Sequence, residues 1–229
     1  GKLPFDQKHI FGMHQRDNDH IFSPIPLEAY SKIENDDTMF LMLGGSIKYE
    51  KQAFDLGIKN ALFCPSTSDV DAIHKFLNTL TVYAHGRSDG EQCSSAIIEA
   101  LSHSLPVITH TAPSMGQAEQ VGLAGACVET VEQYAAMMKM MMEDQEKYDE
   151  FSKEAKRRYD EYYSMNAIID KYAKLFVWLF DPYGQFLLQN PNLYKSMIAP
   201  SQWVKDLYVN KFGMDESKVV VWPVGIELK

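Results

Sequence analysis

From residue 8 to about residue 165, the chain alternates between short apolar runs and longer amphipathic runs. The apolar runs are rich in β-branched and aromatic residues, as in Leu80-Thr81-Val82-Tyr83-Ala84-His85, which is typical of buried strands. Strands are expected at residues 8–13, 39–43, 61–64, 81–85, 107–109 and 126–128. Helices are expected near residues 24–33, 50–56, 69–77, 94–102, 117–121 and 131–142.

Strands that alternate with helices predict an α/β fold, with a doubly wound parallel sheet covered by helices on both faces. In such Rossmann-like sheets, ligands bind outside the carboxyl ends of the strands. We therefore expect a nucleotide-binding lobe over residues 1–165. A charged, aromatic and helical stretch at residues 144–163 leads to a crossover helix over residues 166–180.

The pattern changes at Asp181-Pro182-Tyr183-Gly184, which ends the helix. A strand, a helix and a strand are then expected at residues 195–199, 202–211 and 219–222. They form a small βαβ unit within residues 181–229, and two strands alone cannot bury both faces of a sheet. We expect this partial second lobe to dock on the main domain through the helix at 166–180, or to complete its sheet with another chain as a homo-oligomer. As an isolated fragment it should be largely unfolded.

The 229 residues include 31 acidic and 22 basic side chains, for a formal net charge of −9. This balance argues against general nucleic-acid binding, which rests on clustered Lys and Arg. An anionic small ligand needs only a few cations and a helix N-terminus. The odd, widely spaced cysteines Cys64, Cys93 and Cys127 favour a reduced, cytoplasmic compartment over a disulfide framework. We expect neither a signal peptide nor a membrane span, which needs about 18 apolar residues in a row.

Residues 90–100 join an expected strand to an expected helix and carry two glutamates, Glu91 and Glu99. Eight positions make a little over two helical turns, so Glu99 would lie on about the same face as the residue just before the helix. We expect Glu91 at the mouth of a cleft and Glu99 deeper along its wall. Between them, free N–H groups of the turn at 93–96 would seat a phosphate. This is the outline of a nucleotide-sugar site.

Two histidines, His14 and His85, stand at expected carboxyl ends of strands and face the same cleft, either as site residues or as structural histidines. The other histidines lack metal-ligand spacing, so we expect no metal site: His9, His20, His74, His103 and His110. Asp69-Val70-Asp71 matches a D-x-D metal motif, but its place after Ser68 at a helix start predicts helix capping instead.

Several segments in this order resemble one family over residues 8–175. The segments are Phe11-Gly12-Met13-His14-Gln15-Arg16, Leu43-Gly44-Gly45, Gly90-Glu91, Glu99-Ala100, Leu105-Pro106-Val107-Ile108-Thr109 and Glu119-Gln120-Val121 with Gly125. They resemble the carboxyl-terminal lobe of GT-B glycosyltransferases of family 4 (group 1), with its E-x7-E-A, G-x-P-V-I and G-x-x-E-x-V patterns. In this resemblance Gly45 belongs to the family's V-G-G turn.

The resemblance implies a glycosyltransferase of the retaining, hexosyltransferase type, or its donor-binding part. It would transfer a sugar from a nucleotide-sugar to an unidentified sugar, lipid or protein acceptor. Arg16 would contact the donor diphosphate, and Ser94 and Ser95 would present backbone N–H groups to it. Glu91, the candidate catalytic residue, would hold hydroxyls of the transferred sugar, and Glu99 the ribose. No cofactor and no metal are implied.

Each assignment has a structural alternative. Glu91 and Glu99 could be solvent-facing carboxylates of a helix. Arg16 could form a surface ion pair with Asp17 or Asp19.

The chain departs from the family pattern in two parts of the site. The lysine that usually follows the arginine is absent, with Ile21-Phe22-Ser23 in its region, and Arg87 is the candidate substitute cation. Cys93 and Ser94 stand where glycines are usual in the phosphate turn.

The order of the lobes is also rotated. Residues 196–204 and 219–226 resemble the end of the amino-terminal lobe, yet they follow the carboxyl lobe here. Most of the amino-terminal lobe, with its acceptor site and catalytic histidine, is not identifiable. We therefore expect the chain to bind a sugar nucleotide and to transfer sugar slowly or not at all. Two alternatives stay open, a non-catalytic nucleotide-sugar binding module and a nucleotide-sugar epimerase on the same fold.

Overall fold

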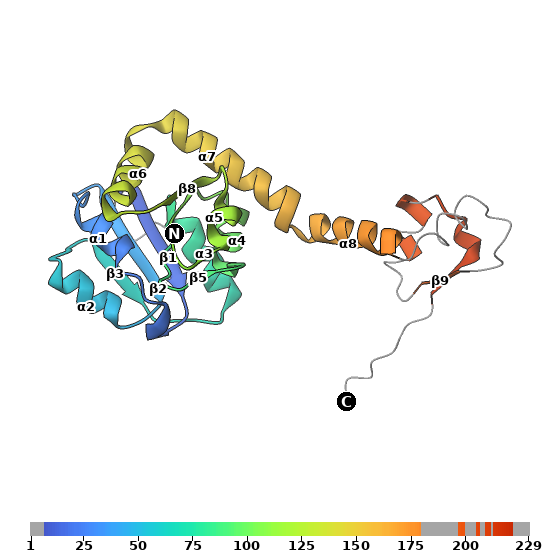
Figure 1. The fold of residues 1–229 in the computed structure, drawn as a ribbon, viewed down its shortest axis with the longest axis horizontal. Coiled ribbons are helices and arrows are strands. Elements are labelled where there is room, and N and C mark those ends of the chain that lie inside the picture. Colours follow the sequence, from blue (N-terminus) through green and yellow to red (C-terminus); the bar gives the residue numbers. More distant parts are fainter. Residues whose placement is uncertain (1–6, 180–196, 200–204, 207–208, 212, 222–229) are drawn as a thin grey trace. The chain divides into compact units, whose positions relative to one another are not determined.

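The computed structural model describes residues 7–179, 197–199, 205–206, 209–211 and 213–221. The chain divides into two compact units, Gly1–Ala167 and Ile168–Lys229 (Figure 1). Most of the expected second lobe at 181–229 lies outside the described residues. Its docking and its assembly with another chain therefore stay predictions.

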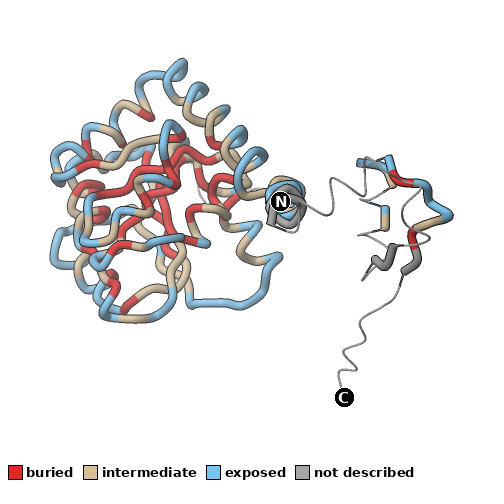
Figure 2. The backbone as a smooth tube through the Cα atoms, turned by 45° about the vertical axis from the view of Figure 1, so that its right-hand side comes forward, coloured by how far each residue is buried: buried red, intermediate tan, exposed pale blue. Residues whose placement is uncertain are grey.

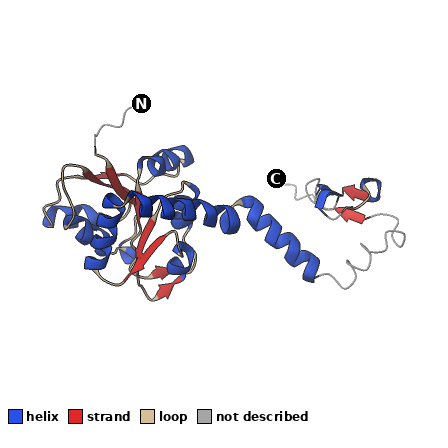
Figure 3. Cartoon of the chain, turned by 90° about the horizontal axis from the view of Figure 1, so that it is seen from above, coloured by secondary structure: helices blue, strands red, loops and turns tan. Residues whose placement is uncertain are grey.

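The first unit is built on a six-stranded sheet in the order β3-β2-β1-β4-β6-β8, drawn as red arrows among blue helices in Figure 3. Its strands are β1 (His9–Gln15), β2 (Thr38–Gly44), β3 (Ala61–Cys64), β4 (Val82–Ala84), β6 (Val107–His110) and β8 (Gly125–Val128). Every neighbouring pair runs parallel. The doubly wound parallel sheet expected from the sequence is confirmed.

Helices pack on both faces of this sheet. They are α1 (Ile25–Ser31), α2 (Lys48–Asp55), α3 (Val70–Thr79), α4 (Ser95–Ser102), α5 (Gly116–Val121), α6 (Val131–Glu143) and α7 (Gln145–Arg158). Helix α1 packs on α2 and α6, while α4 packs on α5 and α7. Helix α3 begins where the Asp69 side chain accepts the N–H groups of Asp71 and Ala72, so the expected capping role is confirmed.

The buried residues lie along the strands and on the sides of the helices that face the sheet (Figure 2). Four tyrosines of this core are fully buried: Tyr30, Tyr49, Tyr83 and Tyr134. A buried hydroxyl costs free energy unless it is hydrogen-bonded. The single proton of the Tyr134 hydroxyl is shared between the carbonyl oxygens of His85 at 2.9 Å and Ile108 at 2.8 Å. Tyr134 thereby fixes the carboxyl ends of β4 and β6 relative to one another.

The strand order places the ligand site. The chain winds from β1 outward to β2 and β3, then crosses back to β4 on the other side of β1. The carboxyl ends of β1 and β4 therefore flank the point where the winding direction reverses, which is where open α/β sheets bind ligands. Beyond β4, the short strands β5 (Gly90–Glu91) and β7 (Ser114–Met115) pair in parallel.

After α7 the chain passes through one π-helical turn, η2 (Tyr159–Tyr163), into α8 (Met165–Leu179). In the second unit, β9 (Met197–Ala199) and β10 (Val219–Val221) pair in parallel, as a βαβ unit predicts. Residues 205–206 and 209–211 of the helix expected between them are helical, and the rest of that helix lies outside the described residues. No helix in the described part of the chain is both long enough and apolar enough to span a membrane.

Candidate functional site

A cleft of about 400 Å³ opens at the carboxyl ends of β1 and β4. Its walls come from the end of β1, the loop after β3, the segment after β4 and the first half of α4. Seven of the nine residues expected in the site line this cleft: His14, Arg16, His85, Arg87, Glu91, Ser95 and Glu99. Ser94 and Gly45 are not among the lining residues.

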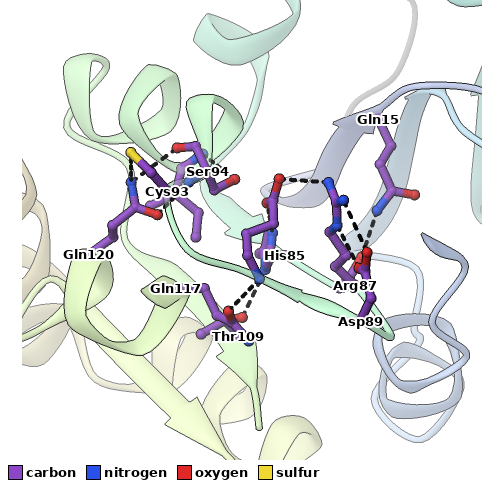
Figure 4. Close-up of polar contacts among 12 residues, drawn as sticks. Gln15, His85, Arg87, Asp89, Cys93, Ser94, Thr109, Gln117 and Gln120 are labelled. Atoms are coloured by element: carbon purple, nitrogen blue, oxygen red, sulfur yellow. Dashed lines mark hydrogen bonds and ion pairs between the residues drawn. The ribbon is translucent and has the colours of Figure 1, made fainter. Parts of the chain in front are cut away.

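Two basic side chains, His85 and Arg87, both labelled in Figure 4, hold the Glu91 carboxylate. Arg87 Nη1 donates to Oε1 at 2.6 Å, and His85 Nε2 lies 3.3 Å from Oε2. Burial raises the pKa of Glu91, but hydrogen bonds from His85 and Ser94 and the charges of His85 and Arg87 outweigh it, so the pKa lies below its ordinary value. Glu91 therefore acts as an ionised hydrogen-bond acceptor.

The expected order of depth of the two glutamates is wrong. The Glu91 side chain is 19% exposed, whereas that of Glu99 is 43% exposed. Arg87 and the buried His85, which both follow β4, hold the Glu91 side chain close to the carboxyl end of that strand. The His85 ring is itself fixed by Thr109 Oγ1, 2.8 Å from Nδ1. Glu91 is therefore the inner carboxylate and Glu99 the outer one.

Arg87, the candidate substitute for the missing lysine, is bonded to two carboxylates. Its Nε and Nη2 donate to the Asp89 carboxylate at 2.6 and 3.2 Å, while Nη1 is bonded to Glu91. These bonds raise the pKa of Arg87. Its guanidinium is thus shared between two carboxylates, which neutralise its charge locally.

Arg16 follows β1 at the rim of the cleft and is exposed. It forms no hydrogen bond or ion pair with any described residue, so the surface pair with Asp17 or Asp19 is not formed. Asp19 is bonded instead to the Ser46 hydroxyl and to Lys48, 3.4 Å away. Arg16 is available to meet an anion in the cleft.

The start of α4 differs from expectation at Ser94. Its hydroxyl caps the helix by accepting the N–H of Ile97 at 3.4 Å, and its own N–H donates to Gln120 Oε1 at 2.6 Å. The expectation that the Ser94 N–H faces a phosphate is therefore wrong, because Gln120 occupies it. The next two residues, Ser95 and Ala96, line the cleft, and their N–H groups have no partner within the described part of the chain.

Two buried glutamines on one face of α5 hold the loop at residues 90–94, and the sequence analysis missed both (Figure 4). Gln120 Nε2 donates to the Ser94 carbonyl at 3.2 Å, closing a two-way amide pair. Gln117 Oε1 accepts the N–H of Glu91 at 2.9 Å. Two glutamines three positions apart at a helix start lie on one face of the helix, and this spacing is the signal that could have found them.

Close approach of α5 to this loop depends on Gly116. A Cβ at this position would lie 2.4 Å from the Glu91 carbonyl oxygen and 2.1 Å from that of Gln92. The glycine in the G-x-x-E motif therefore lets the helix start meet the backbone of the loop that carries Glu91.

Gln15, at the end of β1, is a further lining residue that the sequence analysis missed. Its Nε2 donates to the Gly86 carbonyl at 2.7 Å, and its Oε1 accepts the hydroxyl of the buried Tyr49 at 3.2 Å. Gln15 thus ties β1 to the segment after β4 across the floor of the cleft. Gly45, with φ of +87°, donates its N–H to the Gln15 carbonyl at 2.9 Å and lies beside a smaller hollow at the ends of β2 and β3.

Glu99 points from α4 toward the end of β1. His14 Nε2 lies 2.6 Å from its Oε2. This hydrogen bond lowers the pKa of Glu99, against the opposing effect of burial. In the described part of the chain, no group of three or more His, Cys, Asp or Glu side chains is arranged to hold a metal ion.

A parallel α/β sheet with a cleft at its reversal point, lined by two carboxylates and by the start of a helix, defines a Rossmann-like domain. The sequence pattern of the family described as "Glycosyl transferases group 1" matches residues 25–158, more than half of the chain. The chain belongs to this family. No curated protein sequence matches the chain.

Solved structures of similar fold agree with this assignment. HepE from Anabaena, in complex with UDP-glucose, matches with a TM-score of 0.62 at 17% identity, over 73% of this chain and 48% of that one. A variant of S. aureus TarM, in complex with fondaparinux, alpha-GlcNAc-glycerol and UDP, matches with a TM-score of 0.61 at 20% identity, over 75% and 36%. The catalytic domain of cholesterol-alpha-glucosyltransferase from Helicobacter pylori matches with a TM-score of 0.57 at 20% identity, over 67% and 98%. The chain spans about half the length of the HepE chain.

Proposed function

We propose that this chain is the donor-binding lobe of a glycosyltransferase and that it binds a nucleotide-sugar in the cleft between β1 and β4. One observation carries the proposal. The two glutamates of the E-x7-E motif line a single cleft together with the N-terminus of α4 and with Arg16. Among the described residues, the N–H groups of Ser95 and Ala96 and the Arg16 guanidinium have no hydrogen-bond partner. Carboxylates suit sugar hydroxyls, and N–H groups with a guanidinium suit a diphosphate.

Each part of the donor has a matching part of the cleft. The diphosphate would lie against the N–H groups of Ser95 and Ala96 and the Arg16 guanidinium. Glu99 would accept hydroxyls of the ribose, and Glu91 hydroxyls of the transferred sugar. As the bond to the diphosphate breaks, the negative charge that grows on the leaving group is stabilised by Arg16 and by the positive end of the α4 dipole. We propose that no metal is needed to hold the diphosphate.

The base and the sugar are proposed from the structures of similar fold. HepE and TarM were solved with UDP or UDP-glucose. Uridine diphosphate sugars are therefore the first donors to test, and transfer with retention of configuration is proposed from the family resemblance. The acceptor, whether a sugar, a lipid or a protein, has to be identified by screening.

A second candidate is a nucleotide-sugar binding module without turnover. It is supported by the length of the match, because the chain spans 48% of HepE.

Calorimetric titration with UDP-glucose, UDP-N-acetylglucosamine, GDP-mannose and ADP-glucose tests donor binding. Glu99→Ala should weaken the preferred donor roughly tenfold or more, because ribose hydroxyls lose a charged acceptor. Circular dichroism should show an unchanged fold, and Glu146→Ala, an exposed glutamate in the first turn of α7, is the control. Equal affinity of Glu99→Ala and the parent would remove the ribose assignment.

Product analysis separates the candidate functions. The full chain is incubated with the preferred donor and a panel of acceptors. Turnover at about 1–1000 per second, the usual enzymic range, would show a complete transferase. Binding without turnover would favour the module, and an epimerised sugar would identify an epimerase.

A further inference from the structure

His14 lies between the cleft and the core, at the carboxyl end of β1. On its inner side it meets the fully buried Tyr83. The Tyr83 hydroxyl lies 3.2 Å from His14 Nδ1, and it accepts the backbone N–H of His14 at 3.3 Å. A phenol that bonds both the ring and the backbone of one residue holds that residue in a single orientation.

The outer side of the His14 ring meets Glu99. Nε2 lies 2.6 Å from Glu99 Oε2, and an ionised carboxylate only accepts hydrogen bonds, so Nε2 carries the proton. On the opposite side of the ring, Nδ1 lies 3.2 Å from the Tyr83 hydroxyl, whose one proton is shared between Nδ1 and the His14 carbonyl oxygen, also 3.2 Å away. The rings of Phe76 and Tyr83 stand edge-on to the imidazole, with centroids 6.2 and 5.6 Å away. The imidazole is thus fixed at both nitrogens and along its edges.

We propose that His14 is the positioning residue of the ribose site, which locks the Glu99 carboxylate through one oxygen and leaves the other oxygen for the ribose hydroxyls. This inference rests on the proposed function, in which Glu99 binds the ribose. No described residue bonds Glu99 Oε1, and the side chain is 43% exposed toward the cleft. A glutamate that is already ordered before the ligand arrives loses less side-chain freedom on binding.

Other histidines near Glu99 do not serve this role. His74 of α3 and His103 at the end of α4 act on Glu99 only through their charge. His74 Nδ1 is 2.8 Å from His103 Nε2, and His103 Nδ1 is 2.8 Å from Asn78 Oδ1, so the two rings are bonded to one another and to α3. Of the three histidines, His14 is the one that forms a hydrogen bond with the Glu99 carboxylate.

The test compares each nucleoside diphosphate with its 2′,3′-dideoxy form, using UDP, GDP and ADP as probes. His14→Leu should weaken the preferred ribonucleotide about tenfold, the cost of a hydrogen bond to a charged group, and leave its dideoxy form unchanged. His14→Gln keeps an N–H near the same oxygen and should stay within about threefold of the parent. His9→Gln, at the opposite end of the same strand, is the matched control and should bind like the parent.

A pH series gives a readout that a purely structural role would not move. The bond from His14 lowers the pKa of Glu99, so its loss lets Glu99 protonate at a higher pH. Affinity for the ribonucleotide should therefore fall at a higher pH in His14→Leu than in the parent, while the dideoxy form shows no such displacement. Should His14→Leu fail to fold, Tyr83→Phe removes the support at Nδ1 and should give a smaller loss confined to the ribonucleotide.

The outcomes separate the two proposals. If the parent binds ribonucleotide and dideoxynucleotide equally, or binds neither, Glu99 does not hold ribose and the proposed function fails with the role of His14. If the parent prefers the ribonucleotide but His14→Leu weakens both forms equally, or neither, the role of His14 alone is overturned.

Discussion

The amide pair between Gln120 and Ser94 offers a direct test of how the loop at residues 90–94 is held. Gln120→Leu keeps a side chain of similar size and removes both hydrogen bonds to Ser94, together with a longer one from Nε2 to Cys93 Sγ at 3.6 Å. Gln120 is 4% exposed and Ser94 is fully buried, so water does not replace the lost partner. The substitution therefore leaves the N–H of Ser94 without a partner inside the protein, while the Ser94 carbonyl keeps the N–H of Ile98 at 3.2 Å.

The expected loss follows from these contacts. The N–H bond of Ser94 to Oε1 is 2.6 Å long and the return bond to the carbonyl is 3.2 Å long. Leaving a buried polar group unsatisfied costs about 1–3 kcal/mol. The aliphatic part of Gln120 is already buried, so the leucine methyl groups offset only a small part of this cost. We expect Gln120→Leu to reduce the free energy of unfolding by about 1–3 kcal/mol.

Urea denaturation followed by circular dichroism measures the global effect. Amide hydrogen exchange at Ser94 measures the local one, and protection there should fall more than in the sheet. Gln145→Leu is the control, because Gln145 is exposed and bonds only the exposed Asp149, at 2.9 Å. It should change the free energy of unfolding by no more than about 0.5 kcal/mol.

Two results would refute the reasoning. One is a Gln120→Leu protein that unfolds at the same urea concentration as the parent, with Ser94 equally protected from exchange. The other is an equal loss in Gln145→Leu, which would assign the effect to the general removal of an amide.

Two further predictions concern charge. Arg16→Ala should weaken a nucleoside diphosphate about tenfold and the bare nucleoside hardly at all, because only the former presents charge to the guanidinium; equal losses in calorimetry would assign Arg16 another role. Burial lowers the pKa of His110 from 6.5, and its Nδ1 donates to the Thr111 carbonyl at 2.8 Å. The stability from neutral His110 is complete above about pH 6.5 and is lost as the pH falls through the lowered folded pKa. His110→Gln should therefore reduce the dependence of the free energy of unfolding on pH between pH 7.5 and 5.5, measured by urea denaturation. An unchanged pH dependence would assign this loss of stability to His9 and His103, whose pKa values are also lowered.

The elements of the fold could be predicted from the sequence because they depend on local patterns. The strand at residues 61–64 was expected with the observed bounds of β3, and the other expected strands overlap the observed ones within two residues at each end. Alternation of strands and helices also fixed the parallel sheet, since parallel neighbours need a crossover between them. The sequence thus predicted a cleft outside the carboxyl ends of the strands, and the observed strand order places it at β1 and β4.

The hydrogen-bond and ion-pair partners of the site residues could not be predicted from the sequence. Arg87 and Glu91 are four positions apart, yet nothing in their spacing shows that Asp89 also shares the guanidinium. Gln120 lies 26 positions from Ser94, and its bond to that N–H exists only because α5 packs against the loop before α4.

By itself, the sequence determined the class of protein, the sheet and the two glutamates, because periodicity and motif spacing are properties of neighbouring residues. The tertiary structure decided which glutamate is the less exposed, and which N–H groups and which cation of the cleft have no partner among the described residues. Those outcomes depend on contacts between residues far apart in the chain, such as His14 and Glu99, 85 positions apart. The burial of a charged group and its hydrogen bonds are set by whatever the packing brings next to it.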